Sequence, residues 1–340
     1  VYNDFFHGIV SPWAIRDFLS FAHTNWNPAP RYVLLGGAGN VDYKDFDGYG
    51  NADPCLIPPV LTPTRFGLFG SDAPLADLDG DNVPEVAVGR LPATDTAGFD
   101  LMVDKIVARE QSAAWRNHVM LLADDPDEGG DFYNSSDALR AEIVGPYTSE
   151  TNYFLWPDLA TTRSRLFDGL NAGMGILNYM GHANSVTMGS VPNQFLTRSD
   201  MSLLTNGVRP ALMFAMTCQL SRFALPTTSA PLGELLLLDD GGVAGLWAPV
   251  SESYNTDGTL LGTRLFTAIT QARDVRLGDA MIDVMAHYAA NGMGYPAYPT
   301  LLHTTCLLGD PAAPLAPPGF TYEEWRGLTF SESEAADPMV

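Results

Sequence analysis

The amino-acid sequence predicts an α/β fold, with a mostly parallel sheet covered by helices on both faces. Short apolar runs typical of buried strands alternate along the chain with longer segments that have the apolar spacing of amphipathic helices. The strand-like runs are mostly apolar and do not alternate with polar residues, which indicates strands buried on both sides. Of the 340 residues, 46% are hydrophobic, enough for one large core or two medium ones.

Residues 1–112 are expected to form a smaller α/β subdomain. Its first helix is predicted at "SPWAIRDFLSFAHTNW", with Ser11 as the N-cap and Pro12 at the first helical position. The segment 38–82 is rich in Gly, Asp and Pro, and we expect no regular element there. The other elements predicted in this part are strands at 31–37 and 85–92 and a helix at 97–112.

Residues 113–318 are expected to form the larger subdomain, and residues 319–340 an acidic tail or linker. The larger part shows the same alternation of strand-like and helix-like segments, which implies a parallel or mostly parallel sheet. The predicted elements are strand 118–125, helices 135–145 and 162–173, strands 176–182 and 211–218, helix 230–240, strand 241–250, helices 258–271 and 276–292, and strand 304–311.

The charge of the chain excludes two classes of partner. Its 40 acidic and 18 basic residues give a net charge of −22, whereas nucleic acids and anionic membranes are bound by basic surfaces. Without an uninterrupted apolar run of about 18 residues, no membrane span is expected. We expect a secreted or cell-surface protein of bacterial type, with its signal peptide absent from this segment and with further domains in a longer chain.

One short turn carries four acidic residues. "ADLDGDNVPE" contains Asp77, Asp79, Asp81 and Glu85, and alternating carboxylates with a glycine suit a hard cation such as Ca²⁺. The spacing differs from that of an EF-hand loop, because the glycine and the distant glutamate stand elsewhere. A solvated acidic turn without a metal is the alternative, and the sequence leaves both open.

A histidine and a cysteine each follow a strand-like run. His182 ends "ILNYMGH" and Cys218 ends "ALMFAMTC". In open α/β sheets, the carboxyl ends of neighbouring parallel strands are where active sites lie, and a thiol is activated by an adjacent imidazole. Taken singly, each is better explained as a buried structural residue. Their matching positions favour a catalytic pair, and the chain has neither a His-Glu-x-x-His motif nor a Gly-x-Ser-x-Gly motif.

These two segments, "NYMGHANS" and "FAMTCQLSRF", resemble the gingipain family of cysteine peptidases in the caspase-like clan. Further segments in the order of that family include "ADLDGDNVPEVAVGRLP", "LLADDPDEGGDF" and "LLGDPAAPL". The resemblance covers roughly residues 1–318. It implies a caspase-like catalytic subdomain and a cysteine endopeptidase that acts on proteins or peptides and requires no cofactor for its chemistry.

The resemblance also implies roles for individual residues. Cys218 would be the nucleophile and His182 the general base. Backbone N–H groups of Cys218 and around Gly181 and Ala183 would stabilise the oxyanion. An acidic residue of "LLADDPDEGGDF" would orient the histidine, and the candidates are Asp124 and Asp125.

The resemblance places three residues at the substrate-binding pocket, although more loosely. Asp131 lies near the carboxylate that receives a basic P1 side chain in some members, and Tyr254 near an aromatic pocket wall. Met188 replaces a common aromatic residue. Ala183 replaces a glycine, and at positive φ it would cost about 1 kcal/mol. These departures leave two alternatives on the same fold, a weakened pseudo-peptidase and a calcium-stabilised surface or interaction module.

Overall fold

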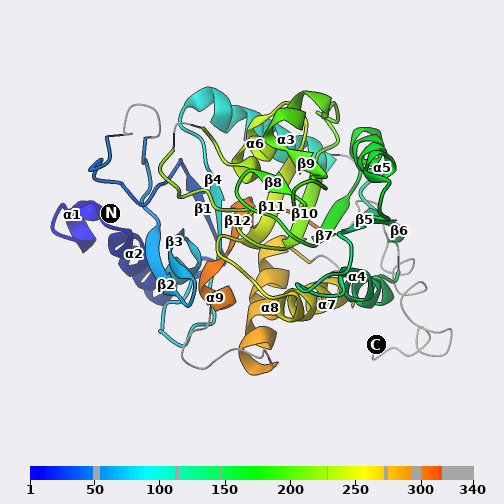
Figure 1. Cartoon of the computed structure of the whole chain (residues 1–340). Helices are drawn as coiled ribbons and strands as arrows, with labels where there is room; N and C mark the ends of the chain where they lie inside the picture. Colours follow the sequence, from blue (N-terminus) through cyan, green and yellow to red (C-terminus); the bar gives the residue numbers. More distant parts are fainter. Residues whose placement is uncertain are drawn as a thin grey trace, which may run out of the picture.

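The computed structural model describes most of the chain and shows an α/β architecture built on one large sheet (Figure 1). The described residues are 1–48, 54–111, 115–145, 147–227, 229–271, 275–291 and 300–315. The predicted tail at 319–340 lies outside them. None of the helices found in the described part is long and apolar enough to cross a membrane.

The sheet has eight strands in the order β1-β4-β12-β11-β10-β7-β5-β6. All neighbouring strands run parallel except β11 and β12, which are antiparallel. The predicted fold class, mostly parallel with a caspase-like arrangement, is confirmed. The strands are β1 (Tyr32–Gly36), β4 (Ala87–Leu91), β5 (His118–Ala123), β6 (Thr148–Tyr153), β7 (Ile176–Met180), β10 (Ala211–Met216), β11 (Val243–Pro249) and β12 (Thr305–Gly309).

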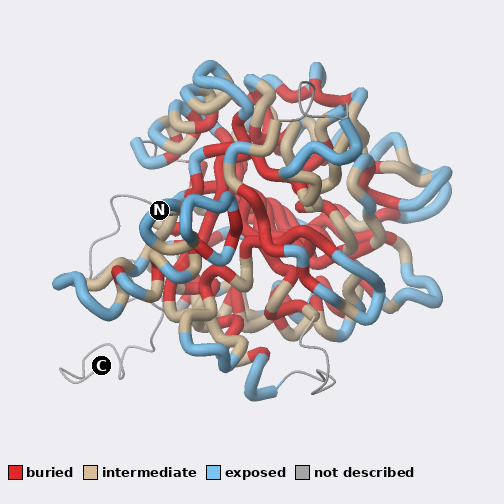
Figure 2. Tube along the Cα trace, turned by 90° about the vertical axis from the view of Figure 1, so that its left-hand side faces the viewer, coloured by how far each residue is buried: buried red, intermediate tan, exposed pale blue. Residues whose placement is uncertain are grey.

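Helices cover both faces of the sheet. One face packs against α3 (Thr96–Gln111), α5 (Leu159–Ala172) and α6 (Leu232–Leu238), and the other against α4 (Phe132–Ala141), α7 (Asn255–Gln271) and α8 (Leu277–Asn291). Each of these faces has its own apolar cluster, and a third, smaller cluster lies between α2 (Pro12–Asn25) and strands β1 and β4. Leu177 of β7 belongs to the first cluster and its neighbour Ile176 to the second, as expected for a strand buried on both sides. Figure 2 shows this central sheet as the most deeply buried part of the molecule.

The sheet continues across residue 112, the expected subdomain boundary. Strands β1 and β4 come from the first part of the chain, and β12 from the end of the larger part joins them to β11. Helix α2 (Pro12–Asn25) begins where the sequence predicts, with Ser11 Oγ accepting a hydrogen bond from the Trp13 N–H at 3.3 Å. The shorter elements are α1 (Tyr2–Phe5), β8 (Thr187–Met188), β9 (Leu196–Thr197), a 3-10 helix (Arg198–Leu203) and α9 (Thr300–Thr304).

The expectation that 38–82 holds no regular element is wrong. It contains a hairpin of β2 (Val60–Thr64) and β3 (Gly67–Ser71), followed by a 3-10 helix (Ala73–Leu75). In β2, buried Val60 and Thr62 alternate with exposed Leu61 and Pro63, as expected for a strand with one buried face. The proline made this strand hard to recognise in the sequence. The edge strand β6 is also missing from the sequence prediction, because its residues are polar and mostly exposed.

Candidate active site

His182 and Cys218 leave the sheet at the same edge and at the same level. Strands β7 and β10 are parallel neighbours in which Met180 pairs with Met216, and each candidate residue lies two positions beyond its paired methionine. Because the strands are parallel and in register, both residues follow the carboxyl ends of their strands. Figure 1 shows β7 and β10 side by side within the sheet. This is the placement that the sequence pattern anticipates.

The imidazole of His182 is held by an aspartate that follows β5. Its Nε2 lies 2.8 Å from Oδ2 of Asp127, and Oδ1 of Asp127 accepts the Gly129 N–H at 2.7 Å. Two backbone hydrogen bonds between Asp127 and Gly130 close the turn that carries this carboxylate. The ring of Phe132 meets the imidazole edge-on, with ring centres 5.2 Å apart. The turn therefore fixes the orientation of the histidine.

The structure differs here from the expectation that Asp124 or Asp125 orients the ring. Asp124 is buried and accepts the backbone N–H of His182 at 3.4 Å and that of Asp125 at 3.0 Å. Asp124 therefore forms a hydrogen bond with the backbone of His182 and not with its imidazole ring. Burial, followed by a hydrogen bond with the Asp125 side chain, raises the pKa of Asp124 to about 7. Sequence reasoning missed Asp127, although the Gly129-Gly130 pair signals a turn that folds it back.

The thiol of Cys218 is hydrogen-bonded to the backbone of Ser253. The sulfur accepts the Ser253 N–H at 3.4 Å, and the S–H donates to the Ser253 carbonyl at 3.6 Å. Burial raises the pKa of this thiol, and the nearby carboxylate of Glu252 adds to the effect. The hydrogen-bond partner of the thiol in this structure is Ser253.

Two side-chain hydroxyls form hydrogen bonds with the backbone at Gly181 and His182. Tyr179 Oη donates to the carbonyl of His182 at 2.6 Å, and Thr217 Oγ1 donates to the carbonyl of Gly181 at 2.5 Å. Gly181 has φ +154°, and a Cβ built on it would lie 2.5 Å from Cβ of Asp124. Only glycine fits this position, and it lets the chain turn sharply from β7 toward the histidine.

Ala183 and Met188 do not have the effects that the sequence suggests. Ala183 is absent from the residues with positive φ, so alanine is accommodated there without backbone strain. It pairs with Met188 through an antiparallel bridge. Met188 is fully buried in the apolar core, and its side chain therefore cannot touch a substrate as expected for a pocket residue.

Asp131 and Tyr254 lie on segments that approach each other beside the site. Asp131 is the N-cap of α4, and its carboxylate accepts both the backbone and side-chain N–H groups of Asn134, at 3.0 and 2.5 Å. Tyr254 precedes α7 and is 46% exposed. Gly130 touches Asn255, because a Cβ on this glycine would lie 2.5 Å from the Asn255 Nδ2. A role for Asp131 or Tyr254 in substrate binding stays a prediction.

The β2–β3 hairpin reaches this region from the first part of the chain. At its tip, the ring of Phe66 lies 5.9 Å from that of Tyr254. The guanidinium of Arg65 stands 5.2 Å from the centre of the same tyrosine ring. The segment for which no regular structure was expected therefore contributes a wall beside the candidate active site.

The acidic turn brings three of its four candidate ligands together. Carboxylate oxygens of Asp77, Asp79 and Glu85 lie within 4.8 Å of one another, whereas Asp81 is not part of this group and accepts the Val83 N–H at 2.8 Å. Three converging carboxylates form a donor set that suits a hard cation. These residues could hold Ca²⁺, with backbone carbonyls and water completing its coordination.

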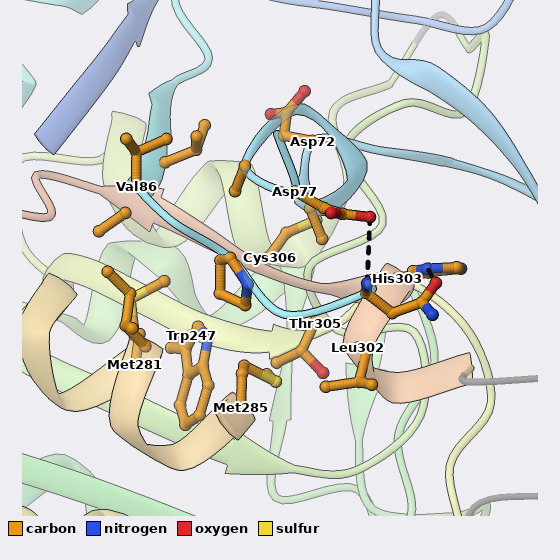
Figure 3. Close-up of a pocket in the computed structure, with 17 residues that line it drawn as sticks. Asp72, Asp77, Val86, Trp247, Met281, Met285, Leu302, His303, Thr305 and Cys306 are labelled. Carbon is orange, nitrogen blue, oxygen red and sulfur yellow. Dashed lines mark hydrogen bonds between the residues drawn. The ribbon is translucent and has the colours of Figure 1, made fainter. Parts of the chain in front are cut away.

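A small cavity lies elsewhere, between η1 (Ala73–Leu75), β4, α8 and α9, and contains neither His182 nor Cys218. Figure 3 shows Trp247, Met281 and Met285 on one side of it and Asp72 and Asp77 on the other. Its volume is about 30 Å³, room for about one or two water molecules. It is too small for a substrate side chain, so it is not a second candidate active site.

Comparison with known proteins finds relatives that match most of this chain. The model of peptidase family C25 matches residues 1–316. Gingipain R2 of Porphyromonas gingivalis is 22% identical over 256 residues, which cover 72% of this chain and 32% of that protein. Gingipain R1 of the same species shows 22% identity over 256 residues, covering 72% of this chain and 23% of the relative. The chain thus spans a third or less of the length of these relatives.

Solved structures give the same result for the fold. The crystal structure of the Arg specific cysteine proteinase gingipain R (RgpB) superposes with a TM-score of 0.70 and 18% identity, covering 93% of this chain and 71% of the other. The complex of the pro- and mature domains of Porphyromonas gingivalis RgpB gives a TM-score of 0.72 with 18% identity, over 92% and 72%. At this identity the similarity establishes the fold.

Proposed function

The chain belongs to peptidase family C25, and we propose that it is a cysteine endopeptidase in which Cys218 is the nucleophile and His182 the general base. One observation carries this proposal. The two residues occupy equivalent positions two residues beyond the paired Met180 and Met216 of adjacent parallel strands. No metal is needed for such chemistry, because the thiol and the imidazole supply nucleophile and base.

The proposed reaction begins when the thiol turns from Ser253 to the imidazole. His182 accepts the thiol proton, and the thiolate attacks the carbonyl carbon of the scissile peptide bond. The resulting oxyanion would be stabilised by backbone N–H groups of Cys218 and Ala183. Collapse of this intermediate breaks the C–N bond, and the imidazolium returns the proton to the leaving amine. Water then hydrolyses the thioester with His182 as base, which restores the thiol.

Asp127 serves this cycle by holding the ring of His182. Its carboxylate is fixed by the Gly129 N–H and faces Nε2. Among the described residues, Nδ1 has no hydrogen-bond partner, so this nitrogen is available to exchange the proton with Cys218. Burial raises the pKa of the Cys218 thiol, so the proposed reaction relies on His182 to accept the thiol proton.

We further propose a preference for a basic P1 side chain. Asp131 and Tyr254 support this, because an exposed carboxylate and an exposed aromatic ring lie on neighbouring segments beside the nucleophile. The printed description of gingipain R as Arg specific concerns that protein, and it makes arginine the first side chain to test here. A negative net charge of 22 would also steer cationic substrates toward the molecule.

Calcium binding at Asp77, Asp79 and Glu85 belongs to this proposal as a stabilising feature. The alternative function, a non-catalytic surface or interaction module, draws its support from the contact between Cys218 and Ser253, in which the thiol is bonded to backbone groups. A secreted or cell-surface location and a longer multidomain chain remain expectations that accompany either reading.

Cleavage-site profiling on a diverse peptide library tests the proposed function, with Cys218→Ala as the blank. We expect the wild-type protein to cleave internal peptide bonds, with a basic residue favoured at P1, and the variant to be inactive. After incubation with a peptide that carries an electrophilic group, mass spectrometry should find the label on Cys218 and not on the buried Cys306. Cleavage that persists in Cys218→Ala, or its absence from the wild-type protein, would reject the assignment.

A further inference from the structure

The residue that follows the nucleophile has an unusual backbone conformation. Gln219 has φ +55°, in the left-handed region, which side-chain-bearing residues seldom occupy. The other non-glycine residues found there in the described part are His7, Asp45 and Asn82, types that tolerate this region better. Such a conformation persists only where its surroundings hold it, and near a catalytic residue it commonly has a functional reason.

The side-chain amide of Gln219 is held at both ends. Its Nε2 donates to Oε1 of Glu252 at 2.7 Å, and its Oε1 accepts from Nη1 of Arg222 at 2.8 Å. The backbone is held as well, because the Gln219 N–H donates to the carbonyl of Ser251 at 2.9 Å and its carbonyl accepts the Arg222 N–H at 3.1 Å. These bonds offset the cost of the left-handed turn.

Each partner connects the turn to another part of the site. Glu252 immediately precedes Ser253, whose backbone N–H and carbonyl both bond the sulfur of Cys218. The guanidinium of Arg222 lies 4.9 Å from the centre of the ring of Phe69, a buried residue of strand β3. The amide of Gln219 therefore links the nucleophile to the β2–β3 hairpin, whose tip packs on Tyr254.

We propose that Gln219 is a positioning residue of the peptidase reaction, resting on the proposed function above. Its amide, clamped between Glu252 and Arg222, maintains the left-handed turn that directs the backbone N–H of Cys218. That N–H is one of the two proposed oxyanion donors. A displaced donor weakens stabilisation of the tetrahedral intermediate more than it weakens substrate binding.

The test exchanges donor and acceptor across the clamp. Gln219→Glu alone places two carboxylates together, and we expect kcat to fall about 10- to 100-fold, with KM changed less than about threefold. Adding Glu252→Gln restores a donor–acceptor pair with the same net charge, and kcat should recover to within about threefold of wild type. Exposed Gln111→Glu at the end of α3 is the matched control. The assay uses the internally quenched peptide that the wild-type protein cleaves fastest in the library.

Alkylation of Cys218 by iodoacetamide separates positioning from loss of structure, because this displacement develops no oxyanion. In Gln219→Glu we expect the alkylation rate and the melting temperature to stay near wild type while kcat falls. Unchanged kcat in Gln219→Glu, no recovery in the double variant, or parallel loss of alkylation and melting temperature would each overturn the proposal. If the wild-type protein cleaves nothing, the peptidase function itself fails and the positioning role with it, an outcome visible before any variant is measured.

Discussion

Asp127 and His182 are paired at 2.8 Å between Oδ2 and Nε2 where both side chains still meet solvent, the imidazole 37% exposed and the carboxylate 46%. Water screens such a pair, so it contributes little to the stability of the fold. The pair instead orients the imidazole, because the Asp127 turn fixes the plane of the ring and leaves Nδ1 available for Cys218. The same turn holds Gly129 directly against the imidazole, since a Cβ there would lie 2.7 Å from Cε1.

Removing the Asp127 carboxylate should slow catalysis without unfolding the protein. In Asp127→Ala we expect kcat to fall about 10- to 100-fold, with KM nearly unchanged, because the imidazole loses its fixed orientation. Steady-state kinetics on the selected peptide measure this. Glu128→Ala removes an exposed acidic neighbour in the same turn and should retain activity within about twofold. Equal losses in both variants would show that only turn structure or local charge matters.

The raised pKa of Asp124 predicts how stability depends on pH. An unfolded aspartate titrates near about 3.9, whereas Asp124 titrates at about 7 in the folded protein. Its bound proton therefore stabilises the fold fully below about pH 4, and this contribution is lost as the pH rises to 7. In Asp124→Asn, which cannot ionise, the melting temperature relative to wild type should rise by at least about 2 °C from pH 4.5 to 8. Thermal unfolding at several pH values measures this; a pH-independent difference would contradict it.

Substitution should strongly reduce activity at Gly181 and barely change it at Ala183. Gly181→Ala forces a Cβ against Asp124 at a backbone conformation that favours glycine, and we expect kcat to fall more than about 100-fold. Ala183→Gly should change kcat less than about threefold, because Ala183 already has an ordinary backbone conformation. The same peptide assay compares both variants. A large gain in Ala183→Gly would instead indicate that alanine strains the site.

Calcium should stabilise the protein through the acidic turn. At free Ca²⁺ about 100-fold above Kd the gain is about 2.7 kcal/mol, so chelation should lower the melting temperature by about 5 °C or more. The double variant Asp77→Asn/Asp79→Asn should lose this calcium response. Asp100→Asn/Asp104→Asn, which removes two exposed acidic residues of α3, should keep it. A chelator effect equal in both variants would place the metal elsewhere, and no effect in the wild-type protein would support a solvated turn.

The fold was predictable where burial dominates the sequence. Strands β7, β10 and β11 are buried along their length and mostly apolar because helices cover both faces, and such runs are recognisable without a structure. Strand β6 escaped prediction because it lies at the sheet edge and exposes Thr148 to Thr151. The β2–β3 hairpin escaped because Pro63 and the flanking glycines resemble loop sequence, while its buried Phe69 finds its partners only in the folded molecule.

For the candidate site, the sequence predicted the positions of His182 and Cys218 after their strands but not the residues that contact them. His182 and Cys218 each follow a recognisable strand, so their level at the sheet edge could be inferred. Asp127 reaches the imidazole only through a tight turn, and four acidic residues within "LLADDPDE" compete for that role in the sequence. The side chain of Gln219 is held by a hydrogen bond to Glu252, which lies 33 positions away in the sequence. No local sequence pattern predicts a contact between residues so far apart.

The position of β12 has a consequence for how the molecule is made. Because this last strand fills the gap between β4 and β11, the strands on either side of it have no partner along that edge until Thr305–Gly309 has been synthesised. The two halves of the nascent chain can each collapse earlier, but the edges facing the gap stay exposed and open to wrong pairings. Assembly of the complete sheet therefore has to wait until the ribosome has passed Thr305–Gly309.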